Sequence, residues 1–310
     1  MRTLVTGASG FVGGHLVAHL LACGDDVLTV DHRDHVRAGA DQVTLDINDT
    51  DALTHAIRTS STDAVYHLAA RSHVGESWSG GDELTRVNVD GTRSVVDACH
   101  AAGVGRVLVV GSAEQYGPVP ADRDAVGEDV PMQPLSPYGV SKLAAEKAAL
   151  TAWSRDGVPV VCVRAFNHTG PGQSPAFFVP GFAGRIARAE ADPAGDDDIA
   201  VGNLDSVRDF TDVRDVVRAY RLLVERGHPG EAYNVCSGRD VAIQEIADRL
   251  LAQAGSSVRL VQDPSLMRPV EVPVLRGDPS RLSASTGWAP ELPLDQTLAD
   301  VLAHWRSTPA

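Results

Sequence analysis

Three side chains have the types and the spacing of a proton-transfer site. Tyr138 and Lys142 stand four residues apart, so on a helix they lie on one face. The pKa of a free tyrosine is about 10. An adjacent ammonium favours the phenolate, so we expect this hydroxyl to exchange protons nearer neutral pH. Ser112 follows an apolar run, and its hydroxyl is predicted to hydrogen-bond a substrate oxygen.

The N-terminus carries glycines at every third position. Gly7, Gly10 and Gly13 follow a short apolar run, and Phe11 and Val12 begin a helical pattern. A turn without side chains lets a diphosphate come close, and a helix N-terminus offers free N–H groups and a partial positive charge. A lone glycine pattern is also typical of an ordinary strand–helix turn. Its place between a strand and a helix predicts a dinucleotide site.

An acidic residue, Asp31, ends the second predicted strand, 18 residues after Gly13. A carboxylate at this place binds both ribose hydroxyls of NAD and repels the 2′-phosphate of NADP. His32 and Arg33 follow, and Arg33 could offset that charge beside a phosphate. The sequence therefore favours NAD and leaves NADP open, with all three residues in the predicted cofactor site.

Two further strand ends fit the same cofactor. Asp46 and Ile47 close the third predicted strand, where an acid could meet the adenine. Leu68, Ala69 and Ala70 end the fourth, and the alanines leave room for the cofactor backbone. Each pattern is also typical of an ordinary strand end. It supports a cofactor site only together with the glycine turn.

The elements that would hold these residues alternate between strand-length apolar runs and helical patterns. Several strands are apolar on both faces, which fits a parallel sheet covered by helices. The pattern predicts an α/β fold, a doubly wound parallel sheet of the Rossmann type, with Ser112 at the carboxyl edge where such sheets bind ligands. The predicted strands are Thr3–Thr6, Asp26–Asp31, Gln42–Asp46, Ala64–Ala70, Arg106–Gly111, Pro159–Ala165 and Ala232–Val235. The predicted helices are Phe11–Cys23, Asp49–Thr59, Glu83–Ala102, Tyr138–Ser154, Val213–Glu225 and Ile243–Ala254.

The alternation of strand and helix patterns changes after about residue 165, where glycine and proline become frequent. We assign residues 1–166 and 213–235 to the dinucleotide-binding domain. Residues 167–212 and 236–310 are predicted to form a smaller C-terminal substrate-binding domain.

Composition narrows the partners. The chain has 27 basic and 41 acidic residues and a net charge of -14, so nucleic acid is not an expected partner. No apolar stretch approaches the roughly 18 residues of a membrane span, and the first strand is too short for a signal peptide. We therefore expect a cytoplasmic protein with no membrane partner. The four cysteines lie far apart in apolar runs, which favours buried free thiols over disulfides, and no metal site is predicted: Cys23, Cys99, Cys162 and Cys236.

These motifs together resemble the short-chain dehydrogenase/reductase superfamily, in its extended sugar-nucleotide branch. Ser112–Gly117 (Ser-Ala-Glu-Gln-Tyr-Gly) and Tyr138–Lys142 look like that branch's motifs, and the resemblance covers nearly the whole chain. Further motifs are similar to those of GDP-4-keto-6-deoxy-D-mannose reductases, which reduce the C4 ketone to give GDP-D-rhamnose. These are Phe166–Gln173, Val201–Phe210, Tyr233–Gly238 and Arg268–Pro273.

The resemblance implies a reductase mechanism. The nicotinamide would give hydride to C4 of the sugar, and Tyr138 would protonate the resulting oxyanion. Lys142 would tune Tyr138 and bind the nicotinamide ribose, while Ser112 would orient the carbonyl. The implied partner is a GDP-sugar, and the residues predicted to contact it are Ser112, Glu114, Asn167, Val179, Arg208, Arg268 and Glu271.

Other readings of the arginines stay open on the residues alone. Arginine matches diphosphate oxygens in bidentate geometry, and a carboxylate suits ribose hydroxyls or a guanine edge. Arg208 could equally pair with Asp209 or Asp212, and Arg268 with Glu271 as a surface ion pair.

Glu114 keeps a second activity in view. The resemblance places it where GDP-mannose 4,6-dehydratases have the base for water elimination, so it belongs with the catalytic candidates. Thr169–Gln173 argues against a dehydratase, which carries a more basic segment there. A nucleotide-sugar epimerase is a further alternative. A non-catalytic NAD(P) sensor is disfavoured because the catalytic residues are present. The superfamily also implies a homodimer, packed through helices Glu83–Ala102 and Tyr138–Ser154.

Overall fold

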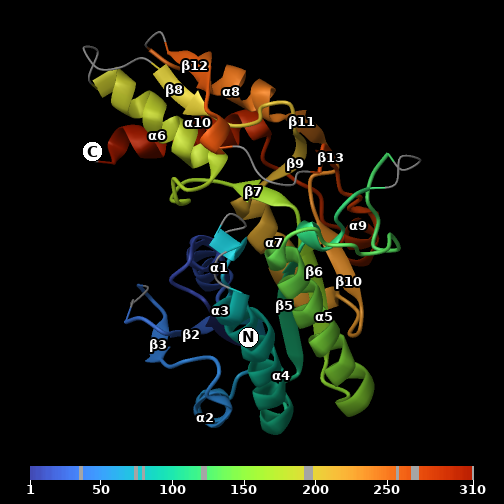
Figure 1. Ribbon diagram of the computed structural model, residues 1–310. Coiled ribbons are helices and arrows are strands. Elements are labelled where there is room, and N and C mark those ends of the chain that lie inside the picture. Colours follow the sequence, from blue (N-terminus) through green and yellow to red (C-terminus); the bar gives the residue numbers. More distant parts are fainter. Residues whose placement is uncertain are drawn as a thin grey trace.

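The computed structural model describes residues 1–34, 38–72, 76–78, 81–119, 124–191, 198–255, 258–266 and 272–308. Its larger part is a seven-stranded sheet between layers of helices, and a smaller mixed sheet with its own helices lies beyond one end of those strands (Figure 1). The predicted α/β fold with a doubly wound, Rossmann-like parallel sheet is confirmed.

The large sheet is parallel at every one of its strand pairs. In spatial order its strands are β10 (Ala232–Val235), β6 (Val160–Ala165), β5 (Arg106–Ser112), β4 (Ala64–His67), β1 (Arg2–Thr6), β2 (Asp26–Asp31) and β3 (Asp41–Thr44). The chain order reverses between β1 and β4, and ligands of such sheets bind at the carboxyl ends beside that reversal.

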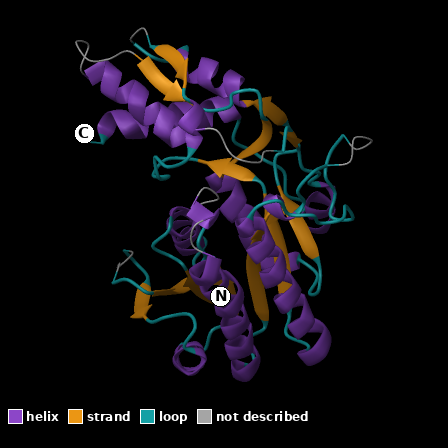
Figure 2. Ribbon diagram, in the orientation of Figure 1, coloured by secondary structure: helices purple, strands orange, loops and turns teal. Residues whose placement is uncertain are grey.

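Helices cover both faces of this sheet (Figure 2). On one face α1 (Phe11–Ala22), α7 (Val213–Arg226) and α9 (Ser280–Thr286) bury Leu16, Tyr220 and Leu282. On the other lie α2 (Thr50–Thr59), α4 (Gly91–Ala102) and α5 (Pro137–Asp156), preceded by the short α3 (Gly81–Thr85). The strands are buried on both faces, as their continuous apolar runs predict.

Several helix boundaries follow the predicted end signals. The carboxylate of Asp49 accepts a hydrogen bond from the Ala52 N–H and so caps α2. Gly103 ends α4 in the left-handed conformation, with φ of 72°, where a side chain would be strained. The predicted helix over residues 83–102 is wrong in one respect, because residues Arg86–Asp90 form a π-helical turn between α3 and α4.

The smaller part is built around β9 (Val207–Asp212). Strands β7 (Asn167–Thr169) and β13 (Val274–Leu275) pair with it in parallel, and β11 (Asp240–Ala242) pairs with it antiparallel. The remaining elements are α6 (Phe178–Ala191), β8 (Asp198–Val201), α8 (Ile243–Leu251), β12 (Arg259–Gln262) and α10 (Leu294–Ser307). The described residues also form the 3₁₀ turns η1 (Glu76–Trp78), η3 (Ala113–Gln115) and η4 (Pro264–Leu266).

The division into domains at residues 166, 212 and 235 stays a prediction. One segment of the predicted substrate-binding domain packs elsewhere, since α9 contacts α7 and β10, and Trp288 joins the core under the large sheet. Cys99, Cys162 and Cys236 are buried free thiols, whereas the prediction for Cys23 is wrong: it follows the last turn of α1 and is exposed. Within the described ranges no helix is both long enough and apolar enough to cross a bilayer.

Candidate functional site

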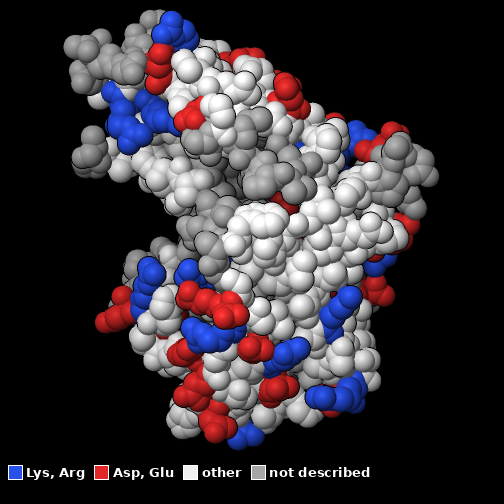
Figure 3. All heavy atoms as spheres, in the orientation of Figure 1, with Lys and Arg blue, Asp and Glu red and all other residues white. Residues whose placement is uncertain are grey.

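A cleft of about 1410 Å³ lies between the carboxyl ends of the large sheet and the smaller part. Figure 3 shows the surface indented between the two parts. The ends of β2 and β5 and the loops that follow β1 and β4 line its lower wall, and α6, β9 and their loops line its upper wall. The cleft therefore occupies the place where the strand order predicts a ligand.

The glycine turn forms one end of this cleft. Gly7, Gly10 and Gly13 line it together with Phe11 and Val12, as the sequence predicts. A Cβ at Gly13 would stand 2.3 Å from the Gly7 carbonyl oxygen, so the turn closes only with glycine there. Helix α1 begins without a side-chain cap and without an acidic residue in its first turn. An uncapped helix N-terminus suits a diphosphate, so these residues fit a dinucleotide.

Asp31 lines the cleft at the end of β2 and is almost fully buried. Its Oδ2 accepts hydrogen bonds from the Ser9 backbone N–H at 3.0 Å and from the Ser9 hydroxyl at 2.6 Å. Burial opposes ionisation, but these hydrogen bonds outweigh it and lower the pKa of Asp31 below its usual range. The carboxylate is thus charged at neutral pH, and it also fixes the glycine turn.

The two residues after Asp31 diverge. His32 lines the cleft, with Nδ1 3.1 Å from the Asp31 carboxylate. Arg33 does not line the cleft in the part of the chain that the structure describes. Its Nε donates to the His32 ring at 3.0 Å. The structure therefore does not bring Arg33 into the cleft with the other predicted cofactor residues.

The other predicted strand ends also line the cleft: Asp46, Ile47, Leu68, Ala69 and Ala70. Arg86 donates a hydrogen bond to Asp46 at 3.0 Å across the rim, with both side chains about half exposed. Strand β4 ends at His67, earlier than predicted, so Leu68–Ala70 form a loop over the crevice.

The catalytic candidates meet at the middle of the cleft. Ser112 is the last residue of β5, and Tyr138 stands in the first turn of α5, which the Ser136 hydroxyl caps by accepting the Gly139 N–H. The Ser112 side chain lies close enough to the phenol of Tyr138 to lower its pKa, and both residues line the cleft. Lys142, one turn further, donates from Nζ to the Val110 carbonyl at 2.8 Å.

The pKa of Tyr138 differs from the predicted direction. Burial raises it to about 12, and the negative charge of Glu114 adds to this, while the Ser112 side chain opposes it. Burial also lowers the pKa of Lys142 to about 8. The expectation that the ammonium favours the phenolate is wrong here, because loss of water costs the buried phenolate more than its neighbours return. At neutral pH the cleft therefore presents a protonated phenol.

The predicted substrate residues divide into two groups. Asn167, Val179 and Arg208 line the cleft, as does Glu114. Arg208 donates to the backbone carbonyls of Val207 and Pro273 at 2.9 and 3.3 Å. Arg268 and Glu271 lie outside the described residues.

The two carboxylates named as alternative partners of Arg208 have other partners. Asp209 accepts from Ser237 and Gly238 at 2.7 to 2.8 Å. Asp212 accepts from Arg214 and Thr297 at 2.7 to 2.8 Å. Both acids hold loops and helix ends in place.

The sequence reasoning missed two cationic residues in the cleft wall. Arg185 and Arg188 lie one turn apart on α6 and both line the cleft. Among the described residues no carboxylate pairs with either, and Arg185 bonds only the Ala200 carbonyl, at 2.8 Å. Burial and the charge of Arg188 lower the pKa of Arg185. Two arginines at helical spacing before an acidic run were the available signal.

Comparison with known proteins agrees with this site. The family model described as GDP-mannose 4,6 dehydratase matches residues 4–301. The chain is 37% identical over 309 residues to the GDP-6-deoxy-D-mannose reductase of Pseudomonas aeruginosa, across 99% of this chain and 97% of that protein. The chain belongs to the extended short-chain dehydrogenases/reductases, in the NAD-dependent epimerase/dehydratase family.

Solved structures extend the likeness to three dimensions. RMD from Pseudomonas aeruginosa, complexed with NADPH, superposes with a TM-score of 0.87 at 35% identity, over 99% of this chain and 100% of that chain. The UDP-glucose 4-epimerase of Thermus thermophilus, in complex with NAD, gives 0.89 at 28% identity, over the whole of both chains. The family comprises NAD(P)-dependent enzymes that modify nucleotide sugars.

Proposed function

We propose that this chain uses NAD(P)H to reduce the C4 ketone of GDP-4-keto-6-deoxy-D-mannose to GDP-D-rhamnose. The observation that carries the proposal is the protonated Tyr138 phenol, which lies with Ser112 inside the cleft. Ketone reduction needs an acid that still holds its proton when hydride arrives at the carbonyl carbon. The 37% identity to a GDP-6-deoxy-D-mannose reductase supports the same reaction.

The chain's own groups would divide the work as follows. Bound NAD(P)H supplies the hydride. Ser112 donates a hydrogen bond to the C4 oxygen and holds the carbonyl in line. Tyr138 transfers its phenolic proton to that oxygen as the C–O double bond becomes single. The phenolate then recovers a proton from water, and we propose that Lys142 binds the nicotinamide ribose.

NAD is the cofactor that we favour. Asp31 is ionised and lies in the cleft at the end of β2, where a carboxylate repels the 2′-phosphate of NADP. NADPH is the alternative, since it is bound in the Pseudomonas aeruginosa structure at 35% identity. Gly7 to Gly13 would hold the diphosphate in either case, and Asp46 and Ile47 would flank the adenine.

The upper wall would hold the GDP moiety. Asn167, Val179 and Arg208 line it, and we propose that Arg268 and Glu271 join them. Arg185 and Arg188 add two guanidinium groups without acidic partners among the described residues, which suits a diphosphate or the acceptor edge of guanine. We also propose that two copies of the chain pair through α4 and α5.

A dehydratase is the second candidate, and Glu114 is the observation that favours it. This carboxylate lines the cleft close enough to Tyr138 for its charge to raise the pKa of the phenol. It could therefore take the proton that leaves during water elimination.

The test separates the two reactions. The enzyme is incubated with GDP-mannose alone, and separately with the 4-keto-6-deoxy sugar nucleotide plus NADH or NADPH. We expect stoichiometric cofactor oxidation only with the keto sugar, and faster with NADH. Turnover of GDP-mannose without net cofactor consumption would instead establish the dehydratase.

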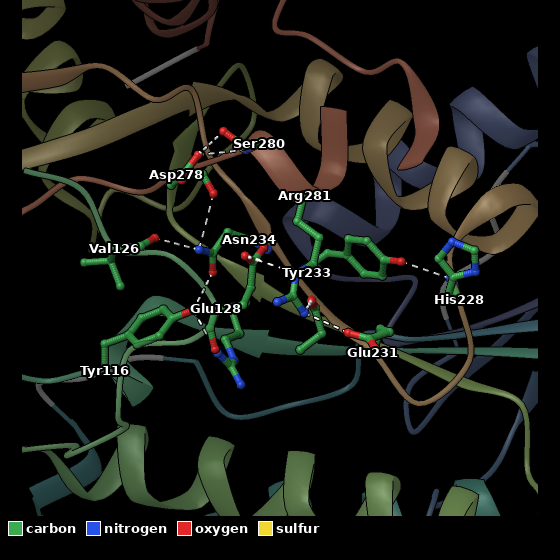
Figure 4. Close-up of polar contacts among 12 residues, drawn as sticks. Tyr116, Val126, Glu128, His228, Glu231, Tyr233, Asn234, Asp278, Ser280 and Arg281 are labelled. Carbon is green, nitrogen blue, oxygen red and sulfur yellow. Dashed lines mark hydrogen bonds and ion pairs between the residues drawn. The ribbon is translucent and has the colours of Figure 1, made fainter. Parts of the chain in front are cut away.

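The Tyr138→Phe variant tests the acid. It should lose at least about 100-fold in kcat while cofactor binding is unchanged. Tyr233→Phe is the matched control, because the Tyr233 hydroxyl accepts from the His228 N–H at 3.0 Å away from the cleft (Figure 4). Equal turnover of both variants would exclude Tyr138 as the proton donor.

A further inference from the structure

A series of buried polar side chains leads from Ser112 into the interior. The Ser112 backbone N–H donates to Oε1 of Gln115 at 2.7 Å. Nε2 of the same amide donates to Oε2 of Glu146 at 2.7 Å. Ser112, Gln115 and Glu146 are 8%, 0% and 2% exposed, so water does not compete for these bonds.

The direction of the Gln115 amide is set by Glu146. A carboxylate only accepts hydrogen bonds, so the NH₂ group must face Glu146 and Oε1 must face Ser112. Arg164 pairs with that carboxylate and donates to both its oxygens, at 2.7 and 3.1 Å. Burial opposes the charge on Arg164, but the bonds to Glu146 overcome it and raise the pKa of the guanidinium. If the amide were reversed, its NH₂ group would face the Ser112 N–H, donor against donor. Its oxygen would face the Glu146 carboxylate, acceptor against acceptor.

The strand makes room for this amide. A Cβ at Gly111 would stand 2.4 Å from Oε1 of Gln115 and 2.7 Å from the Val163 carbonyl oxygen. Only glycine at the residue before Ser112 therefore lets the amide reach the strand end. The hydrogen-bonded series thus joins the end of β5 to Gln115 of η3 and Glu146 of α5.

The same bonds define where the Ser112 hydroxyl lies. Ser112 and Gln115 form a capping box at the start of η3, and Oγ accepts the Glu114 N–H at 3.2 Å. The Ser112 side chain also lies close enough to the Tyr138 phenol to lower its pKa, against the larger effect of burial.

We propose that Gln115 and Glu146 are positioning residues that aim the Ser112 hydroxyl at the substrate carbonyl, an inference that rests on the proposed function. Gln115 acts on the Ser112 backbone, and Glu146 acts through the orientation of Gln115. Neither touches the substrate. Near-attack geometry is sensitive to displacements of less than about 1 Å, so loss of this support lowers kcat more than it raises KM.

A second branch of the network leads away from Ser112 and supplies a control. Arg164 donates to the Tyr116 hydroxyl at 2.9 Å, and that hydroxyl donates to Oδ1 of Asn234 at 2.7 Å. Figure 4 shows Tyr116 and Asn234 meeting on the side where Asp278 and Arg281 approach. Tyr116→Phe removes two buried hydrogen bonds and leaves Gln115 and Glu146 in place.

The experiment is a double-mutant cycle on the holoenzyme with the keto sugar nucleotide. Gln115→Met keeps the volume and removes the hydrogen bonds of the amide to Ser112 and Glu146. In the wild-type background we expect kcat to fall about tenfold with little change in KM. In the Ser112→Ala background the same substitution should change kcat less than about twofold, because no hydroxyl remains to be aimed.

The outcomes are distinguishable. Equal losses in both backgrounds overturn the positioning role and leave a structural one. Unchanged turnover of Ser112→Ala rejects the role of Ser112 in the proposed function and this inference with it. Tyr116→Phe should lower the unfolding midpoint in urea and leave kcat unchanged; a tenfold loss there would assign the effect to general loosening.

A conservative variant, Gln115→Glu, tests the direction of the bonds. A carboxyl at this place satisfies both neighbours only when protonated, since it must accept from Ser112 and donate to Glu146. We expect kcat near wild type at low pH and a new fall as the pH rises, absent from wild type and from Tyr116→Phe. A pH profile that superposes on the wild type overturns the inference.

Discussion

At the residue level, burial decides which protonation states the cleft offers. Types and spacing correctly predicted that Tyr138, Lys142 and Ser112 would meet at the sheet edge. The direction of the Tyr138 pKa could not be predicted, because it depends on water exclusion by side chains distant in sequence. The cofactor contact of Arg33 stays a prediction; its Nε donates to the His32 ring, a bond that the sequence did not predict.

His67 gives a residue-level prediction of acid sensitivity. Its ring is buried between the hydroxyls of Thr6 and Thr92, at 2.8 and 3.0 Å. Burial, with the nearby Lys142 charge, lowers the pKa of His67 to about 3. Between pH 6.5 and that value the unfolded chain binds one proton more. The free energy of unfolding should therefore fall with falling pH, by about 1.4 kcal/mol per unit from this group.

Urea unfolding at several pH values between about 6.5 and 4.5 measures this contribution. Other carboxylates also titrate in acid, so the comparison is with His67→Gln, which lacks the proton site. The free energy of unfolding of the wild type should fall more steeply with falling pH than that of the variant. The difference between the two slopes should correspond to one bound proton. Parallel curves would show that His67 is protonated as readily in the folded chain as in the unfolded one.

At the level of elements, local sequence signals predicted the turns and helix ends that depend on neighbouring residues. The glycine turn, the Asp49 cap and the Gly103 stop each act within a few residues, and each appears where expected. No local signal predicted the π-helical turn at Arg86–Asp90, because its extra residue is held by partners elsewhere in the fold. Asn88 in that turn donates to Ser141 Oγ at 2.9 Å and exchanges two hydrogen bonds with the Arg71 backbone.

The π turn therefore has a measurable anchor. Asn88→Ala leaves the backbone N–H and carbonyl of Arg71 without their side-chain partner and removes one of the two hydrogen bonds of the Ser141 hydroxyl, and buried unpaired groups cost about 1–3 kcal/mol each. We expect the free energy of unfolding in urea to drop by about 2–4 kcal/mol. Thr85→Ala, which removes an exposed hydroxyl bonded to the Gly81 carbonyl, should cost less than about 0.5 kcal/mol. Similar losses in the two variants would contradict the anchoring role.

At the level of the whole molecule, the parallel sheet was predictable and the smaller part was not. Strand–helix alternation in the first half constrains the topology, because parallel crossovers are nearly always right-handed. The pairs β8 with β12 and β9 with β13 join segments about 60 residues apart or more, and no local pattern marks them. The return of α9 to the large sheet is likewise set by burial of Leu282 and Trp288.

The proposed pairing of two chains is testable at this level. Val140 on α5 is 53% exposed, and Figure 3 shows few charged side chains over the middle of this face. We expect light scattering to give the mass of a dimer for the wild type and of a monomer for Val140→Glu, because a charge would be buried in the interface. Val261→Glu, at an exposed valine of β12, should remain dimeric. A wild-type monomer would refute the pairing.

The path of the chain has a consequence for how the two parts can be separated. The backbone passes between the large sheet and the smaller part near residues 166, 212, 235, 276 and 292. Neither part is therefore a continuous stretch that a single cut could release or a truncated gene could encode.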